Sequence, residues 1–277
     1  MIAVNQVESV PSVLESAATG EIAEIYADIR ATLGTSVVNL VWRNLATLPG
    51  ALPWAWSMAR PLYLGGAAGH AETVRRTLSL PKSPRFSADA LSAAGLSSSE
   101  LTQIRNILDS YHHTNALALV VLSALLEHEE PSATKPIERP EAPPPSIRTE
   151  LPPLPAMATL QPAVQRLIAE LNGFGEDDAP FLIASMYRHL AYWPSFLAII
   201  RTALAPLQAD QSLIALTHRA RAMGHAHGGV LSRQMKPSPP PSSLQDALAS
   251  CRLFVEHPIA RMTGICAVIH ASMPEPG

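Results

Sequence analysis

The sequence predicts an all-α protein made of two tandem helical repeats that pack as an intramolecular pseudo-dimer. Three observations lead to this fold class. Apolar residues recur at helical spacing along the chain, and no convincing run alternates with the period of two that marks a half-buried strand. A proline-rich segment lies near the middle of the chain. The sequences on its two sides align with each other, which indicates an internal duplication.

The proline-rich segment predicts the domain organisation. Nine of the 26 prolines fall between positions 131 and 155. Proline can neither continue a helix nor donate the hydrogen bonds of a sheet. We therefore expect residues 131–156 to be a linker between a first helical repeat, 1–130, and a second helical repeat, 157–277.

The repeat is clearest when Arg43 is placed on Arg188. This register aligns RNLATLPGALPWAWSMARPL with RHLAYWPSFLAIIRTALAPL, and seven of the 20 aligned positions are identical. Chance would give roughly one or two identities in a chain this rich in Ala and Leu. Both halves are therefore expected to fold alike.

Each half is expected to begin with an amphipathic helix. In the first half, apolar residues between positions 22 and 33 fall at helical spacing, and Gly34 closes the segment. In the second half, Pro162 fits the first turn of a helix that Gly173 ends.

Shorter apolar helices are expected next, over 37–48 and 181–193, each ended by proline. Turns rich in Ser and Pro then lead to paired helices, and Ser97 with Glu100 has the spacing of a capping box. The longest apolar stretch without charge, 114–126, is shorter than the roughly 20 residues that a bilayer requires. We expect a buried helix there and no membrane partner.

Composition and charge exclude several functional classes. The net charge is −3 and only 16% of the residues are charged, so no basic field exists for nucleic acid or an anionic membrane. The first 21 residues lack the basic start of a cleaved signal, so we expect a cytoplasmic protein. Cys251 and Cys266 form no CxxC motif and are expected to be reduced and buried.

The sequence gives no clear signal for a cofactor. Its ten histidines do not fall into HExxH or ExxH patterns, and GxGxxG, P-loop and GxSxG motifs are absent. We expect no metal and no other cofactor. The histidines considered as metal ligands are His112, His113, His225, His227, His257 and His270.

Two polar sites in apolar surroundings are candidates for function. Asn115 opens the run ALALVVLSALL, and its amide needs several hydrogen-bond partners. It is either a helix cap or a polar anchor for water or substrate between the repeats. Ser185 and His189 lie four residues apart and would share one helix face, with Met186 beside them. His189 is either a packed histidine or a base.

These segments resemble the group I 2-haloacid dehalogenase family, the DehI-type enzymes. The resemblance rests on GEIAEIYADIRATL, NLATLPGALPWAW, Asn115 before an aliphatic helix, and SMYRHLAYWP, in this order across most of the chain. It implies an all-α pseudo-dimer with its active site between the repeats, usually in a homodimer. It also implies hydrolysis of the carbon–halogen bond of small 2-halocarboxylic acids of either hand, by direct attack of an activated water.

Carried over position by position, the resemblance assigns roles to site residues. The family's water-holding asparagine falls on Asn115, and the serine before its catalytic aspartate falls on Ser185. Apolar pocket positions fall on Val37 and Leu40. The water-activating aspartate itself falls on Met186, whose thioether cannot accept a proton from water.

The loss of this aspartate changes the expected chemistry, because general-base assistance contributes about 10²–10⁴-fold to a rate. The first repeat supplies no carboxylate either, since its matching residue is Val41. The first candidate for a replacement base is His189. The others are Glu256 or His257, near the start of the last helix, and, under a shifted alignment, Asp177 or Asp178.

The sequence thus predicts a divergent dehalogenase-like hydrolase that takes a small carboxylate between its repeats and forms a homodimer. Its dehalogenation is expected to be altered or lost. The alternative is a non-dehalogenating helical protein that binds or transforms a small apolar carboxylate or another metabolite. A third interpretation is a metal-dependent enzyme that uses the histidines.

Overall fold

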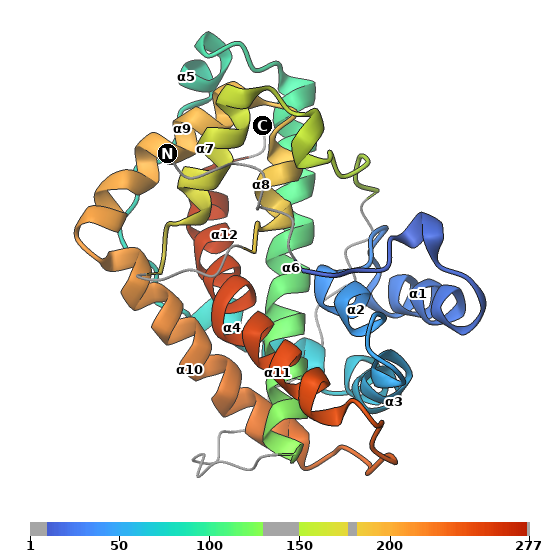
Figure 1. Ribbon diagram of the computed structural model, residues 1–277. Helices are drawn as coiled ribbons and strands as arrows, with labels where there is room; N and C mark the ends of the chain where they lie inside the picture. Colours follow the sequence, from blue (N-terminus) through green and yellow to red (C-terminus); the bar gives the residue numbers. More distant parts are fainter. Residues whose placement is uncertain (1–9, 130–149, 177–181, 276–277) are drawn as a thin grey trace.

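The computed structural model describes residues 10–129, 150–176 and 182–275. Over these ranges the chain folds into α-helices joined by short turns, and no β-strand is formed there (Figure 1). The predicted all-α class is therefore confirmed.

The first half passes through a short 3₁₀ turn and a series of α-helices that ends in one long helix. The elements are η2 (Glu15–Ala17), α1 (Gly20–Leu33), α2 (Leu40–Leu45), α3 (Ala51–Leu64), α4 (Ala67–Thr77), α5 (Ala88–Ala93) and α6 (Ser98–Glu129).

The second half has a similar order of elements, with a π-helical turn before its last helix. The elements are η3 (Met157–Thr159), α7 (Pro162–Asn172), α8 (Ser185–Leu190), α9 (Pro194–Ala209), α10 (Ser212–Ser232), α11 (Leu244–Phe254), η4 (Val255–Ile259) and α12 (Ala260–Ser272). This order is the one that a tandem repeat would give. The duplication and its packing as a pseudo-dimer stay predictions.

Several residues that were predicted to begin or end helices do so in the structure. Gly34 ends α1 in the left-handed region, with φ 65°, and its N–H donates to the carbonyl of Arg30. Pro162 is the first residue of α7. Before α6, the Glu100 N–H donates to the Ser97 hydroxyl (3.3 Å) and the Glu100 carboxylate accepts from the Ser97 N–H (2.8 Å). This reciprocal pair is the predicted capping box.

The helix expected over 37–48 is shorter in the structure, because α2 begins only at Leu40. The Val37 N–H donates to the hydroxyl of Thr35 (3.3 Å), and the Val38 N–H donates to the carboxylate of Glu15 (2.8 Å). These side-chain acceptors bind the two amides outside the helix, so α2 begins only after residue 39.

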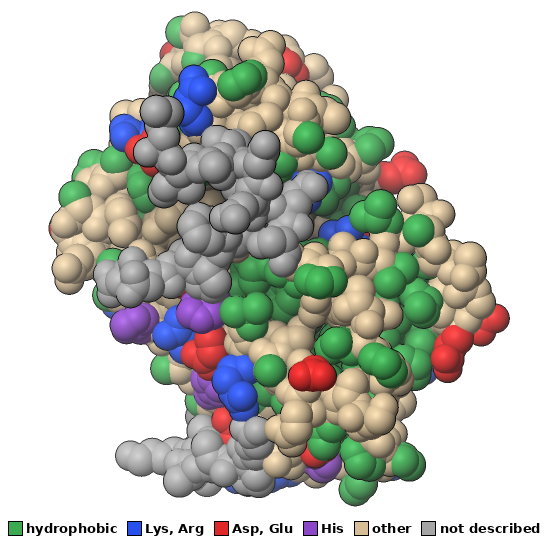
Figure 2. Space-filling model, viewed as in Figure 1, with side chains coloured by type: hydrophobic (Ala, Val, Ile, Leu, Met, Phe, Trp, Pro, Cys, Tyr) green, Lys and Arg blue, Asp and Glu red, His purple; other side chains and the backbone are tan. Residues whose placement is uncertain are grey.

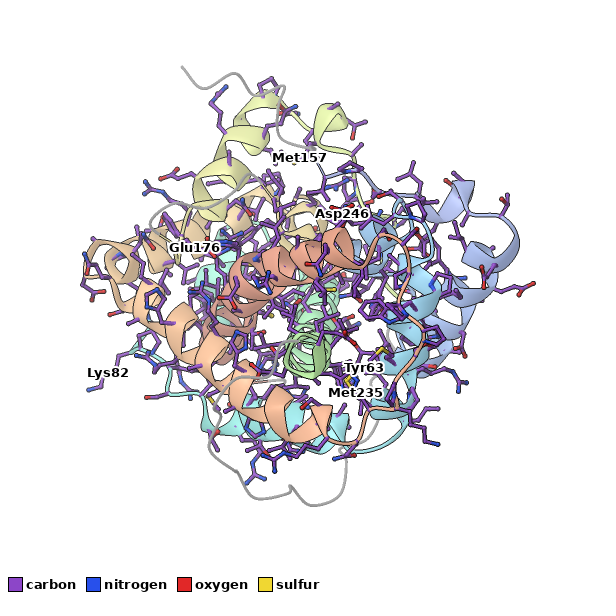
Figure 3. All side chains as sticks on the ribbon, turned by 60° about the horizontal axis from the view of Figure 1, so that its bottom comes forward. Tyr63, Lys82, Met157, Glu176, Met235 and Asp246 are labelled. Atoms are coloured by element: carbon purple, nitrogen blue, oxygen red, sulfur yellow. The ribbon has the colours of Figure 1, made fainter. Side chains whose placement is uncertain are left out.

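Helix α6 lies at the centre of the molecule, packed against α4, α10 and α12 (Figure 1). Figure 3 looks along α6, drawn in green, with side chains of the other helices around it. Residues 114–126 of α6 are all buried, which confirms the predicted buried helix. The close approach of α10 depends on Gly228, because a Cβ there would lie 2.6 Å from Cβ of Ser123.

Most of the predicted linker, 131–149, lies outside the described residues. Its last part, 150–156, has no regular secondary structure and lies against α8. The carbonyls of Pro152, Pro153 and Pro155 accept hydrogen bonds from His189, Tyr192 and Arg188, respectively. These prolines supply acceptors to the helix. The domain boundaries stay predictions.

Two statements from composition can be compared with the structure. Cys251 and Cys266 are both buried free thiols, as predicted. Side chains of both charges are scattered over the face shown in Figure 2, in keeping with the small net charge of −3. Within the described ranges, we find no helix with the length and apolar character needed to cross a bilayer.

Candidate active site

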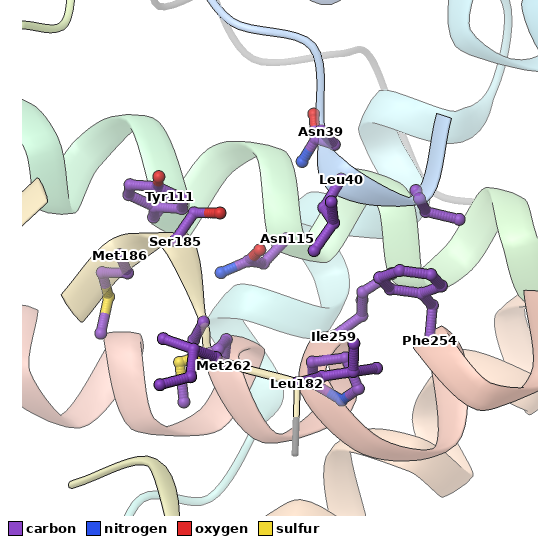
Figure 4. A pocket seen from close by; sticks show the side chains of 14 residues that line it. Asn39, Leu40, Tyr111, Asn115, Leu182, Ser185, Met186, Phe254, Ile259 and Met262 are labelled. Atoms are coloured by element: carbon purple, nitrogen blue, oxygen red, sulfur yellow. The ribbon is translucent and has the colours of Figure 1, made fainter. Parts of the chain in front are cut away.

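A cavity of about 60 Å³ lies between α2, α6, α8 and the junction of η4 with α12 (Figure 4). Both halves of the chain contribute to its lining. A water occupies about 10–15 Å³ on this measure, so the space fits a molecule of roughly five water-sized groups. The apolar lining residues are Leu40, Val41, Leu182, Ile183, Ala184, Met186, Phe254, Pro258, Ile259 and Met262, and the polar ones are Asn39, Tyr111, Asn115 and Ser185.

The two polar residues of α6 reach the cavity because they lie four positions apart on one helix face. Tyr111 and Asn115 are both buried, and Figure 4 shows them along the same side of the helix. Ser185 and Met186 begin α8 opposite them. The hydroxyl of Ser185 and the amide of Asn115 are both directed towards the middle of the cavity (Figure 4).

Asn115 has an unpartnered donor. Its side chain is 7% exposed, and Nδ2 makes no hydrogen bond within the described residues. The interpretation of Asn115 as a helix cap is wrong, because α6 runs without a break from Ser98 to Glu129. A buried donor without an acceptor costs about 1–3 kcal/mol. An acceptor on a molecule in the cavity would remove this cost.

Met186 is completely buried and lines the cavity next to Ser185. Among the described lining residues there is no Asp, Glu or His. The polar groups at this cavity are two amides and two hydroxyls. None of them is a base of ordinary strength near neutral pH.

The two predicted apolar pocket positions are placed differently. Leu40 lines the cavity, together with its neighbours Asn39 and Val41. Val37 is not among the lining residues, and its N–H donates to the hydroxyl of Thr35.

His189 lies behind Tyr111 and does not line the cavity. Its side chain is 1% exposed. Nε2 is 3.0 Å from the carbonyl oxygen of Pro152, and Nδ1 is 2.6 Å from the hydroxyl of Tyr111. Burial lowers the pKa of His189 to about 4, and Arg188 acts in the same direction while the Pro152 carbonyl opposes it. His189 reaches the cavity only through Tyr111.

The other proposed bases have partners elsewhere. The Glu256 carboxylate lies 2.7 Å from Nε2 of His225 and 2.9 Å from Nε of Arg221. His257 Nδ1 lies 2.9 Å from the carboxylate of Glu176. Neither Glu256 nor His257 lines the cavity. Asp177 and Asp178 lie outside the described residues.

The histidines considered as metal ligands are distributed among different contacts. His227 pairs with His70 through their Nδ1 atoms (2.8 Å), His112 stacks on His270, and His270 Nε2 contacts Asp109 (2.7 Å). In the part of the chain that the structure describes, His, Cys, Asp and Glu side chains nowhere gather in threes as a metal site would require.

Sequence reasoning missed several lining residues. Tyr111 is not among the residues proposed from the sequence, although its spacing of four from Asn115 places it on the same helix face. Phe254, Ile259 and Met262 reach the cavity from the π-helical turn η4 and its flanks. Nothing in the local sequence pattern indicated this turn.

The fold and the cavity define an all-helical protein with a small, mostly apolar pocket whose described polar groups are neutral. A scan of protein-family models gives no match. The chain is similar to two curated proteins described as "2-haloacid dehalogenase, configuration-inverting". The one from Alcaligenes xylosoxydans xylosoxydans is 29% identical over 226 residues, covering 76% of this chain and 75% of the relative. The one from Pseudomonas sp. (strain 113) is 27% identical over 244 residues, covering 81% and 78%.

Solved structures agree with this similarity at the level of the fold. A D-2-haloacid dehalogenase mutant in complex with D-2-CPA matches with a TM-score of 0.66, and a D-2-haloacid dehalogenase in complex with L-LA matches with 0.67. Both are 21% identical to this chain and cover 94% of each chain. The resemblance found in the sequence is confirmed: the chain is similar to 2-haloacid dehalogenases along most of its length, at the modest identity of a divergent relative.

Proposed function

We propose that the chain is a hydrolase of the carbon–halogen bond of small 2-halocarboxylic acids, with a changed proton acceptor because Met186 occupies the position of the family's aspartate. The observation that carries this proposal is the unpartnered Nδ2 of Asn115 inside a small cavity that Ser185 and Met186 also line. The similarity to dehalogenases along three quarters of the chain supports it.

The chemistry of the cavity suits such an acid. A carboxylate or a water oxygen offers the acceptor that the Asn115 amide lacks. The apolar lining, which includes Phe254, Ile259 and Met262, would surround a halogen and a short alkyl group. We propose that Asn115 holds the attacking water, that Ser185 and Leu40 contact the substrate, and that Met186 contributes only apolar contact.

A second candidate follows from the absence of an ordinary base among the described lining residues. A cavity with these groups can bind a small apolar carboxylate without hydrolysing it. This alternative differs from the first in turnover and not in binding, so both must be measured.

The test is halide release from racemic 2-chloropropionate and 2-bromopropionate between pH 6 and 10. The variants are Met186→Asp, which restores a carboxylate, and Met186→Asn, a control of similar size that cannot accept the proton. We expect slow release by the wild type and a higher rate, by up to about 10²–10⁴-fold, for Met186→Asp only. Binding of propionate, measured by calorimetry, shows that the pocket is intact in each variant.

The outcomes separate the candidates. Release by the wild type supports the hydrolase. Propionate binding without release by the wild type supports the binding protein. If folded Met186→Asp binds propionate but releases no more halide than Met186→Asn, residue 186 is not the position of the lost base.

We also propose that the chain is a cytoplasmic homodimer, on the basis of the family resemblance. Light scattering on the purified protein would then give twice the chain mass of 29.6 kDa. A mass of one chain at micromolar concentration would contradict the dimer.

A further inference from the structure

We infer that Tyr111 and His189 form a proton relay that replaces the missing carboxylate, with Tyr111 facing the attacking water and His189 accepting the Tyr111 proton. The inference rests on the proposed function, because it names the base of the same cavity. It requires that the two residues be joined by a hydrogen bond in the correct direction, and that Tyr111 reach the cavity.

The carbonyl of Pro152 determines the direction of that hydrogen bond. A carbonyl oxygen only accepts, so Nε2 of His189, 3.0 Å away, carries the proton in the neutral ring. Nδ1 then carries no proton, and it accepts the hydrogen bond from the Tyr111 hydroxyl, 2.6 Å away. Tyr111 therefore donates to His189, and its oxygen can accept one hydrogen bond from Ser185 and one from a further donor in the cavity, which Tyr111 lines.

The surroundings keep the tyrosine protonated at rest. Burial raises the pKa of Tyr111 well above its usual value, while the charges of Arg188 and Arg43 and a hydrogen bond with Ser185 lower it. A separate phenolate is therefore not formed before the reaction. Tyr111 can accept a proton only as it passes its own proton to Nδ1 of His189.

His189 has a basicity suited to this role. Its pKa of about 4, lowered mainly by burial, is close to the ordinary value of about 3.9 for an aspartate. The imidazole is thus about as strong a base as the carboxylate that it would replace. Its Nε2–H bond to Pro152 would persist in the imidazolium, since both ring nitrogens then donate.

The step balances as a single displacement. The oxygen of water bonds to C2 of the 2-haloacid while the C2–halogen bond breaks and the halide leaves with its electron pair. One water proton moves to Oη of Tyr111, and the Tyr111 proton moves to Nδ1 of His189. The products are a 2-hydroxy acid and halide, and the imidazolium later releases its proton to solvent.

The chain itself offers a matched control for His189. Asn44, the residue that the predicted repeat aligns with His189, donates from Nδ2 to the carbonyl of Pro11 (2.8 Å) and accepts from Ser250 through Oδ1. An asparagine in this setting keeps one donor on a prolyl carbonyl and one acceptor for a hydroxyl. His189→Asn would offer one donor and one acceptor, as the neutral imidazole does, and remove the base.

The experiment compares Tyr111→Phe and His189→Asn, each alone and combined with Met186→Asp, in the full chain. We measure kcat and KM for halide release from 2-bromopropionate, and the dependence of kcat on the D₂O fraction. Each single variant should lower kcat about 10²–10³-fold with little change in KM. The wild type should give a curved D₂O dependence, because two protons move in one step. In the Met186→Asp background the same changes should alter kcat by less than about threefold, because the aspartate takes the proton directly.

The results distinguish the relay from the proposed function. If the wild type is inactive while Met186→Asp releases halide, the pocket is that of a dehalogenase and the relay is overturned. The relay is also overturned if Tyr111→Phe and His189→Asn lower kcat equally in the wild type and in Met186→Asp, because equal effects would indicate a structural role. If folded wild type and Met186→Asp both release no halide, the proposed function fails and the relay fails with it.

Discussion

The crossing of α6 and α10 gives a quantitative prediction for Gly228→Ala. The added Cβ would lie 2.6 Å from Cβ of Ser123, 2.7 Å from its carbonyl carbon and 2.8 Å from the backbone nitrogen of Ala124. Carbon atoms pack best at about 3.5–4.0 Å, so the two helices must separate by about 1 Å. The obstacle is largely backbone, which cannot be relieved by a change of rotamer.

Two contributions set the expected magnitude. Overpacking of this kind costs about 1–3 kcal/mol. The replacement of a helical glycine by alanine raises the free energy of unfolding by about 0.5–1 kcal/mol. At the middle of both ranges, Gly228→Ala should lower the free energy of unfolding by about 1.3 kcal/mol, with an upper limit of about 2.5 kcal/mol. The mid-range value lowers the Tm by about 3–5 °C.

The assay is urea denaturation followed by circular dichroism, with Gly66→Ala as the control. A Cβ at Gly66 would meet its nearest atom, Cδ2 of Leu231, at 3.6 Å, which is ordinary contact. We expect Gly66→Ala to stay within about 0.5 kcal/mol of the wild type. A Gly228→Ala protein as stable as the wild type would show that α6 and α10 do not approach as closely as described, and that the placement of Tyr111 and Asn115 relies on other contacts.

Three further predictions concern buried polar and titratable groups. Asn115→Leu removes the unpartnered Nδ2 at similar volume. The free energy of unfolding in urea should therefore be unchanged or higher, while the binding of propionate is lost. A less stable variant would show that Asn115 has a structural partner. Burial lowers the pKa of His189 from its ordinary value of about 6.5 to about 4. The unfolded chain then binds a proton that the folded chain does not, and stability falls as the pH decreases from about 6.5 to 4. His189→Asn should reduce this slope by up to about 1.4 kcal/mol per pH unit between pH 5 and 6, and an unchanged slope would contradict the burial of a neutral imidazole. Cys251 and Cys266 should not react with a thiol reagent at pH 8 until the chain is unfolded. Burial raises the pKa of both thiols, and that of Cys251 to about 12. Rapid reaction of the native protein would show that the helices around the two cysteines open.

The helices were predictable because their signals are local. Gly34 and the Ser97–Glu100 pair act through backbone atoms a few residues away, and the apolar spacing of α1 is visible in any short window. The boundaries of α2 were not predictable. They depend on the Glu15 carboxylate, which lies 23 residues from the amide of Val38 that it binds.

The site was predictable only in part, because some of its contacts join residues far apart in the sequence. The resemblance to a family pointed to Asn115, Ser185 and Met186, and the structure places all three at one cavity. The contact between Tyr111 and His189 joins residues 78 positions apart, and no periodic pattern encodes it. The cavity wall at Pro258 depends on a π-helical turn, which local propensity does not specify.

Under the proposed function, a methionine at position 186 in place of a carboxylate affects binding as well as turnover. An aspartate at this position would share a cavity of about 60 Å³ with the carboxylate of a substrate, and two like charges at short distance in an apolar setting repel strongly. Methionine removes this repulsion, while the charges of Arg188 and Arg43, which lower the pKa of Tyr111, favour an anion nearby. The wild type is therefore expected to hold a small acid more tightly and to convert it more slowly than a relative with the aspartate. Met186→Asp should accordingly raise kcat and weaken the binding of propionate together, and tighter binding by this variant would show that the substrate carboxylate does not lie near residue 186.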